Sequence, residues 1–151
     1  FKISNREEAE DLTHQVFLSA WQNLKTYRFQ GLPFSSWLYR IARNKIIDHY
    51  RTRQTHEPLE HADALLASAP ENLTDRTDAA LDMERIRAAI RRLPADQQDV
   101  VIMRFVSDMP YRDVAATLQK TEGAVKVIQH RALKKLRDLL GAALPAIEES
   151  T

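Results

Sequence analysis

The sequence contains no cysteine, only three glycines, and no apolar run that approaches the length of a membrane span. Without cysteine the chain can form neither disulfides nor thiolate metal sites, and a reducing, cytoplasmic location is the natural expectation. So few glycines, together with abundant Ala, Leu, Arg, Asp and Glu, favour an all-helical protein. No segment resembles a signal peptide, so we expect no membrane insertion.

The motifs of common enzymes are also missing. The chain has no glycine loop that could cradle a phosphate, no recognisable nucleophile motif, and no His pair with metal-ligand spacing on a convincing helix. His56 and His61 lie beside Glu57 and Glu60, but this pattern is more typical of a solvated acidic loop than of a metal site. We therefore expect no catalytic residue, no metal and no cofactor, which indicates that the protein is not an enzyme.

The 151 residues include 44% hydrophobic side chains, which is enough for a core, and their net charge of +1 conceals a pattern. Residues 1–53 carry a balance of +4, residues 54–80 a balance of −5, and residues 81–151 a balance of +2. Two basic blocks thus flank an acidic segment. The overall charge does not suggest nucleic-acid binding, but its distribution permits it.

Helical periodicity predicts a helix over residues 6–25 and another over residues 35–51, with Ser35 or Ser36 as the N-cap. Gly31 and Pro33 mark the loop between them. The side chains expected to face a core are Leu12, Val16, Phe17, Ala20, Trp21 and Leu24 in the first helix, and Leu38, Ile41, Ala42 and Ile46 in the second.

Residues 54–80 lack clear periodicity, apart from a possible helical turn at residues 62–67, and so resemble a linker. A structureless segment of this length inside one compact domain is unusual, which favours two domains. We expect one domain at residues 1–53 and another at 81–141, followed by a tail at 142–151. The second domain is predicted to contain helices at 81–93 and 96–106, and the first of these should bury Ile86, Ala89, Ile90 and Leu93.

The segment from Tyr111 to Arg137 predicts a short helix, a tight turn and a longer basic helix. Ala115 is small where two helices cross, Val125 is expected to be buried, and Thr121 is a good N-cap for the second helix. Gln119 occupies a turn position that often needs positive φ, where Gly is favoured. From this segment alone, a helix-turn-helix that binds DNA is only modestly favoured over a purely structural helix pair.

If the second helix enters a major groove, its early residues face base edges and its later cations face phosphates. Val127 could then touch a thymine methyl group. The residues expected to contact DNA are Thr121, Lys126, Val127, Gln129, His130, Arg131 and Lys134.

Aromatic and basic residues also alternate between Tyr27 and Arg53. Aromatic faces stack on unpaired bases while cations follow phosphates, so this segment is a second candidate for nucleic-acid binding. Phe34 is more simply explained as a core residue. For Arg40 and Arg43 the two interpretations, DNA contact and solvated surface charge, are equally supported by the residues alone.

Two parts of the chain together resemble a known family. Residues 7–53 contain Glu10-Asp11-Leu12, Phe17–Trp21 and the run FSSWLYRIARN from Phe34 to Asn44, and they resemble the second conserved region of bacterial sigma-70 factors. Residues 83–137, with Leu93-Pro94 and the helix-turn-helix, resemble the fourth region. The pattern is most similar to the extracytoplasmic-function (ECF) group. The beginning of the second region is absent, so a helix is expected to be missing from the first domain.

The resemblance implies a factor that binds core RNA polymerase, recognises a promoter and helps to open it. The expected partners are the clamp coiled coil of the largest polymerase subunit, the polymerase flap, promoter DNA and an anti-sigma factor. The residues implied to bind polymerase are Asp11, His14, Gln15 and Leu18. Those implied to bind the −10 element are Tyr27, Arg28, Phe29, Gln30, Arg40, Arg43 and Asn44, while the helix-turn-helix would recognise the −35 element.

In this family the linker passes through the polymerase towards the active centre, and its acidic balance suits a channel built for RNA. A stand-alone helix-turn-helix regulator is the alternative function, and an inactive sigma-like protein that only sequesters a partner is a third. Tight binding to duplex DNA without polymerase would favour the stand-alone regulator.

Overall fold

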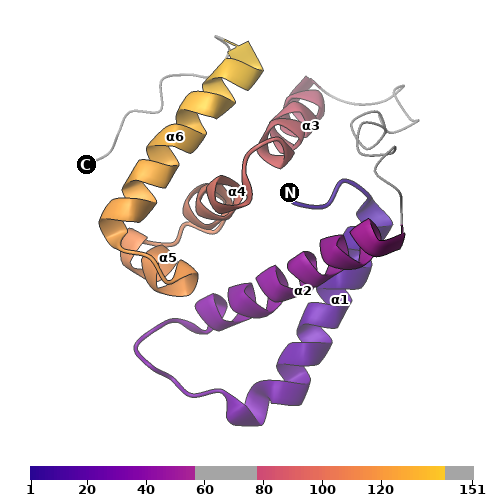
Figure 1. Ribbon diagram of the computed structural model, residues 1–151, viewed down its shortest axis with the longest axis vertical. Coiled ribbons are helices and arrows are strands. Elements are labelled where there is room, and N and C mark those ends of the chain that lie inside the picture. The colour runs from indigo at the N-terminus through magenta and orange to yellow at the C-terminus, as the bar shows by residue number, and fades with distance from the viewer. Residues whose placement is uncertain (57–77, 142–151) are drawn as a thin grey trace. The chain divides into compact units, whose positions relative to one another are not determined.

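A computed structural model describes residues 1–56 and 78–141, and the chain within these ranges is helical with no strand, as the composition predicted (Figure 1). The helical turn expected at residues 62–67, most of the linker and the tail at 142–151 lie outside the described residues. The chain divides into two compact units. The N-terminal unit is Ile3–Asp75, and the C-terminal unit is Arg76–Thr151 together with Phe1–Lys2.

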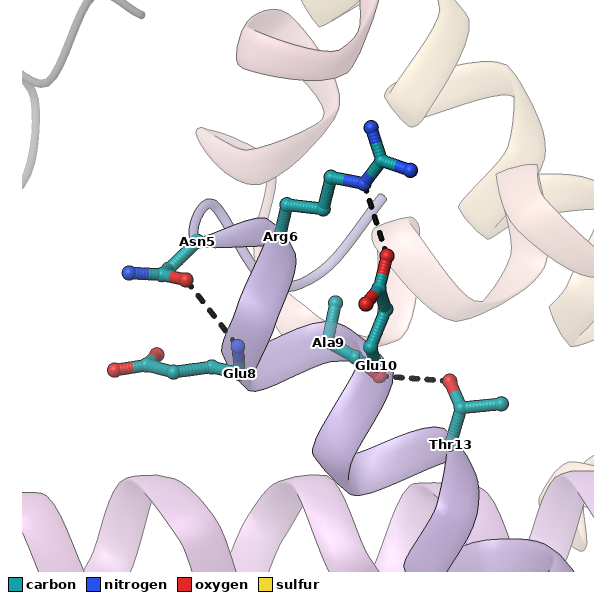
Figure 2. Close-up of polar contacts among 6 residues, drawn as sticks. All are labelled: Asn5, Arg6, Glu8, Ala9, Glu10 and Thr13. Atoms are coloured by element: carbon teal, nitrogen blue, oxygen red, sulfur yellow. Dashed lines mark hydrogen bonds and ion pairs between the residues drawn. The ribbon is translucent and has the colours of Figure 1, made fainter.

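The N-terminal unit begins with α1 (Arg6–Asn23), whose start is fixed by local side-chain contacts. Figure 2 shows the Asn5 Oδ1 atom accepting a hydrogen bond from the Glu8 N–H at 3.2 Å, which satisfies one of the free donors of the first turn. The Thr13 hydroxyl donates to the Ala9 carbonyl at 2.7 Å, and Arg6 pairs with Glu10 at 2.9 Å. Sequence-local contacts therefore define this helix.

The helix α1 continues through the short 3-10 helix η1 (Leu24–Thr26) and a loop to α2 (Phe34–His56), which packs against it. Leu12 and Ala20 are buried, as predicted. The prediction that Phe17, Trp21 and Leu24 face the core is wrong, because their side chains are 60%, 77% and 45% exposed. α1 packs mainly against one neighbouring helix, which covers only a narrow stripe of its surface.

The predicted N-cap of α2 is also wrong. The helix begins at Phe34, so Ser35 and Ser36 lie inside its first turn, and the Ser36 N–H donates to the Pro33 carbonyl at 3.0 Å. Proline suits the residue before the helix because it has no N–H of its own to satisfy, while its carbonyl still accepts a hydrogen bond. At the other end α2 reaches His56, beyond the expected Arg51.

The C-terminal unit contains α3 (Asp78–Arg91), α4 (Ala95–Val101), η4 (Ile102–Val106), α5 (Tyr111–Leu118) and α6 (Glu122–Leu140). The single helix predicted over residues 96–106 is in fact α4 followed by a π-helical turn, η4. The Ser107 N–H donates to the Ile102 carbonyl at 3.0 Å, five residues back. Such wide turns are often found at functional sites.

The core of the C-terminal unit lies between α3, α4 and α6. The predicted apolar face of α3 is confirmed, because Ala89, Ile90 and Leu93 are buried and Ile86 packs beside them. Asp99 is a buried charge in α4 and pairs with Lys2. The three buried residues of α3 and its end share one apolar cluster with Val101 of α4 and with Ala132 and Leu136 of α6.

Candidate nucleic-acid interface

The turn between α5 and α6 has the geometry that its residues predicted. Gln119 adopts φ 55° and ψ 45°, which is the left-handed conformation expected at this position. The Lys120 N–H donates to the Ala115 carbonyl at 2.8 Å, so the turn closes the end of α5. The Thr121 hydroxyl accepts from the Ala124 N–H at 3.1 Å, which confirms Thr121 as the N-cap of α6.

The packing of α5 against α6 fixes which side of α6 is left exposed. Ala115 in α5 is 5% exposed and Val125 in α6 is 0% exposed, so both predicted core positions are confirmed. Because α6 buries Val125, Ala132 and Leu136, its opposite side faces solvent. The helix-turn-helix is therefore a rigid support for one exposed face of α6.

Most of the residues predicted to contact DNA lie on that face. Lys126, His130 and Lys134 follow one another at intervals of four residues, and adjacent positions add further side chains. The exposed predicted residues of α6 and its cap are Thr121, Lys126, Val127, His130, Arg131 and Lys134. The face thus combines cations with one aliphatic side chain.

Gln129 differs from these residues because it is half-buried. Its Oε1 atom accepts a hydrogen bond from Nε of Arg104 at 3.3 Å. An arginine has no acceptor, so the carboxamide oxygen, not the nitrogen, must face Arg104. Gln129 therefore ties α6 to the preceding π-helical turn.

Arg104 was not identified from the sequence, although it joins three elements. Its NH1 group donates to the Met109 carbonyl at 2.6 Å, and its guanidinium lies 4.0 Å from the centre of the Tyr111 ring. Nζ of Lys126 lies 5.3 Å from the same ring centre. The one signal in the sequence is an arginine within the apolar run VVIMRFV, since a cation there needs buried partners.

The N-terminal unit contains a cavity of about 200 Å³ between the loop and the start of α2. It brings together four of the seven residues predicted for the −10 element, namely Tyr27, Arg28, Gln30 and Arg40. Phe29 is 74% exposed, and neither it nor Arg43 nor Asn44 lines the cavity. Thr26, Leu32, Pro33, Ser36 and Trp37, which were not among the predicted site residues, complete the lining.

Three aromatic rings gather beside this cavity. The ring centres of Tyr27, Phe34 and Trp37 lie 5.2 Å from one another, with Tyr27 and Phe34 nearly perpendicular. The expectation that Phe34 is a core residue is wrong, because 42% of the side chain is exposed and its contacts are with these rings. Contacts between aromatic rings at such distances are favourable, and two of these rings, Tyr27 and Trp37, line the cavity.

The face of α1 opposite its buried stripe carries the residues predicted to bind polymerase. Asp11, His14 and Gln15 are exposed, and Leu18 is 57% exposed. Phe17 and Trp21 add exposed apolar area to this helix. Apolar surface of this kind is typical of an interaction site.

A larger apolar groove of about 680 Å³ lies in the C-terminal unit. Ile86 of α3, Phe105 of η4 and Leu133 of α6 contribute to its walls, and the lining also includes His130, Lys134 and Arg137 of α6, the first two of which belong to the exposed face described above. The sequence did not predict this groove, because it forms only where three separate helices meet.

Neither a metal centre nor a membrane span is found in the described ranges. No group of three His, Cys, Asp or Glu side chains within residues 1–56 and 78–141 is placed to hold a metal ion. Each helix in the same ranges is too short or too polar to cross a membrane. The side chain of His56, and His61 with its neighbouring glutamates, lie outside the part of the chain described in this detail.

Comparison with known families matches both units. Residues 2–56 match the family model described as Sigma-70 region 2, and residues 83–136 match the model described as Sigma-70, region 4. These two matches lie on either side of the acidic segment. The first includes the cavity beside α2, and the second includes the exposed face of α6.

Three curated relatives are ECF RNA polymerase sigma factors. BldN of Streptomyces coelicolor is 33% identical over 141 residues, which cover 93% of this chain and 53% of the relative. SigD of Mycobacterium tuberculosis is 35% identical over 143 residues, covering 89% and 64%. EcfG of Rhodopseudomonas palustris is 33% identical over 136 residues, covering 90% and 73%. The chain thus spans between about half and two-thirds of the first two relatives.

Two solved structures are similar in both fold and sequence. One is the sigma factor RpoE in complex with the anti-sigma factor NepR from Bartonella quintana, with a TM-score of 0.74 and 25% identity over 94% of this chain and 86% of that one. The other is CnrH in complex with the cytosolic domain of CnrY, with a TM-score of 0.65 and 25% identity over 93% and 75%.

Proposed function

Because the chain belongs to the ECF group of sigma-70 family RNA polymerase sigma factors, we propose that it directs core RNA polymerase to specific promoters and assists their opening. The N-terminal unit recognises the −10 element and the C-terminal unit recognises the −35 element. The polymerase performs the chemistry, and this chain supplies recognition.

Recognition of the −35 element is assigned to the exposed face of α6. Lys126, His130 and Arg131 occupy the first half of this helix, where side chains reach base edges when a recognition helix enters the major groove. Val127 is half-exposed between them and suits a thymine methyl group. Lys134 lies one turn further and suits a phosphate, while Thr121 lies at the cap. Gln129 contributes by holding α6 in place through Arg104.

Recognition of the −10 element is assigned to the cavity and its surroundings. Tyr27, Arg28, Gln30 and Arg40 form a small site with aromatic, amide and cationic groups, which suits one unpaired base. Removing a base from the stack costs a few kcal/mol, and such a site offsets that cost. The exposed ring of Phe29 stacks on a neighbouring base, and Arg43 with Asn44 support the adjoining strand.

Binding to polymerase is assigned to two surfaces. Asp11, His14, Gln15 and Leu18 on α1 face the clamp coiled coil of the largest subunit. The apolar groove of the C-terminal unit, with Phe105 among its residues, takes an apolar segment of the polymerase flap. Two surfaces in separate units allow the polymerase to hold the two DNA-binding sites at a fixed distance.

An anti-sigma factor and a cytoplasmic location complete the proposal. The similar RpoE and CnrH structures are both complexes, the first with an anti-sigma factor and the second with the cytosolic domain of CnrY. The proposed domain limits are those expected from the sequence, residues 1–53 and 81–141 with residues 54–80 as a linker, but α2 extends into that segment as far as His56 and α3 begins within it at Asp78. The −5 balance of that linker suits a channel that later holds RNA.

The observation that carries this proposal is the presence, in one chain, of an aromatic cavity in one unit and an exposed basic recognition helix in the other. The purified chain is expected to bind core RNA polymerase and to support initiation from a subset of promoters in a reconstituted reaction. Failure of the chain to bind core polymerase, or initiation that does not depend on adding it, contradicts the proposal.

A further inference from the structure

One face of α2 forms a wall of the cavity in the N-terminal unit. Ser36, Trp37 and Arg40 of α2 line this cavity, and their spacing is that of a single helix face, while Pro33, which directly precedes the helix, lines it as well. Ser35 lies on a different face, where it lines a separate apolar groove with Leu38. Ser36 lies at one edge of the face that it shares with Trp37 and Arg40, and it is among the residues that line the cavity.

Ser36 is unusual because its hydroxyl is buried without a partner. The residue is 1% exposed, and the Oγ atom makes no hydrogen bond among the described residues. A serine in a helix often satisfies its hydroxyl by bonding to a carbonyl of the preceding turn, as Thr13 does in α1. Buried polar groups nearly always have a partner, so an unpaired one calls for a ligand or another explanation.

The surroundings of this hydroxyl indicate what kind of ligand would pair with it. The rings of Tyr27 and Trp37, whose centres are 5.2 Å apart, both line the cavity, and a planar aromatic molecule can stack on such rings. A group at the edge of that planar molecule would meet Ser36. An unpaired DNA base has both features, a flat face and a polar edge.

We propose that the Ser36 hydroxyl hydrogen-bonds to the polar edge of the unpaired base that enters this cavity and thereby determines which base is accepted. The inference rests on the proposed function and assigns a specificity-determining residue to its −10 site. A hydroxyl rotates to donate or to accept, so it matches the edge presented by the correct base. A base with a matching group gains this hydrogen bond, whereas a base without one leaves the hydroxyl unpaired as it is in the free chain, and that difference produces the discrimination.

The test replaces the hydroxyl and measures base preference. Promoter DNA with a pre-opened bubble, randomised across the −10 element, is bound by the full chain with core polymerase, and bound sequences are counted. The Ser36→Ala variant is expected to lose roughly 3- to 10-fold of the wild-type preference at one base position, as for loss of one hydrogen bond. The matched control is Ser35→Ala, which changes an exposed serine on the other face and should keep the wild-type preference.

Two further measurements separate a binding role from a structural one. DNA with an abasic site at the selected position should bind equally well to wild type and Ser36→Ala. Thermal unfolding of Ser36→Ala should occur at the same or a higher temperature than that of wild type, because the change removes an unpaired buried hydroxyl.

Three results would overturn the inference. The first is an unchanged base preference in Ser36→Ala, and the second is an equal loss on all sequences, which would indicate a phosphate contact. The third is a clear fall in melting temperature, which would indicate a structural hydroxyl. Each of these is distinct from failure of the proposed function, in which the wild-type chain itself would not load polymerase onto any promoter.

Discussion

Two valines in α6 show how residues two positions apart serve different purposes. Val125 is 0% exposed and packs in the helix-turn-helix, whereas Val127 is 50% exposed on the proposed DNA-binding face. The same side chain therefore contributes to folding at one position, and we propose that it contributes to recognition at the other. Period and spacing in the sequence predicted that Val125 is buried, which the structure confirms, and placed Val127 on a different face of the helix, where its contact with DNA stays a prediction.

This contrast gives a paired prediction. Val125→Ala is expected to lower the free energy of unfolding of the C-terminal unit by about 2 kcal/mol, because it removes two buried methyl groups and leaves a cavity. Val127→Ala should change it by less than about 0.5 kcal/mol and should instead alter promoter preference. Urea unfolding of both variants checks the pair, and equal losses of stability would contradict the assignment of the two faces.

Arg104 illustrates a residue whose role the sequence could not supply. Its partners are the Met109 carbonyl, the Tyr111 ring and Gln129, and the last of these lies 25 residues away in the chain. A contact of that separation depends on how α6 packs against η4, which no local pattern encodes. The sequence consequently placed Gln129 among residues that face DNA, whereas its side-chain oxygen is bonded to Arg104.

Arg104→Ala is expected to destabilise the C-terminal unit by about 2 kcal/mol, because hydrogen bonds donated by a charged group are among the stronger ones. Arg104→Lys keeps the charge but not the planar fork, so it should recover only part of this loss. Chemical denaturation of the two variants measures the effect. Full recovery by lysine would show that charge, and not the three-way contact, is what matters.

At the scale of single elements, the sequence predicted best what local contacts decide. The Thr121 cap and the left-handed Gln119 depend on neighbouring residues only, and both are confirmed. The start of α2 and the exposure of Trp21 depend on which helices pack together, and both predictions were wrong. The π-helical turn after α4 was not predicted either. A single extra residue in one turn does not change the spacing of apolar residues enough to be recognised in the sequence.

The start of α1 offers a test of such local control (Figure 2). Asn5→Ala removes the acceptor for the Glu8 N–H and is expected to cost about 1 kcal/mol of stability in the N-terminal unit. Asn5→Asp keeps the acceptor and adds a negative charge near the helix N-terminus, so it should be neutral or slightly stabilising. Amide hydrogen exchange in the first turn of α1 measures both. Equal exchange in all three proteins would show that the cap contributes nothing.

At the scale of the whole molecule, the fold class and the family could be predicted from the sequence, but the shape of the proposed −10 site could not. Its residues come from the loop and from one face of α2, and Ser36 joined them only because the helix begins earlier than predicted. A serine at an N-cap has its hydroxyl satisfied by a backbone N–H, so the sequence pattern alone indicates no ligand role for Ser36. In the structure Ser36 lies inside the first turn of α2 and is not the cap, and its hydroxyl has no hydrogen-bond partner among the described residues.

The central claim is that two sites in separate units act together only when polymerase holds them. The most direct measurement is selection from a promoter library randomised at both elements, performed with the chain alone and with core polymerase. We expect a two-part sequence motif only with polymerase, and Arg131→Ala should relax the upstream part by about 1–3 kcal/mol while leaving the downstream part unchanged. Tight, sequence-specific binding of duplex DNA by the chain alone would contradict the account and favour a stand-alone regulator.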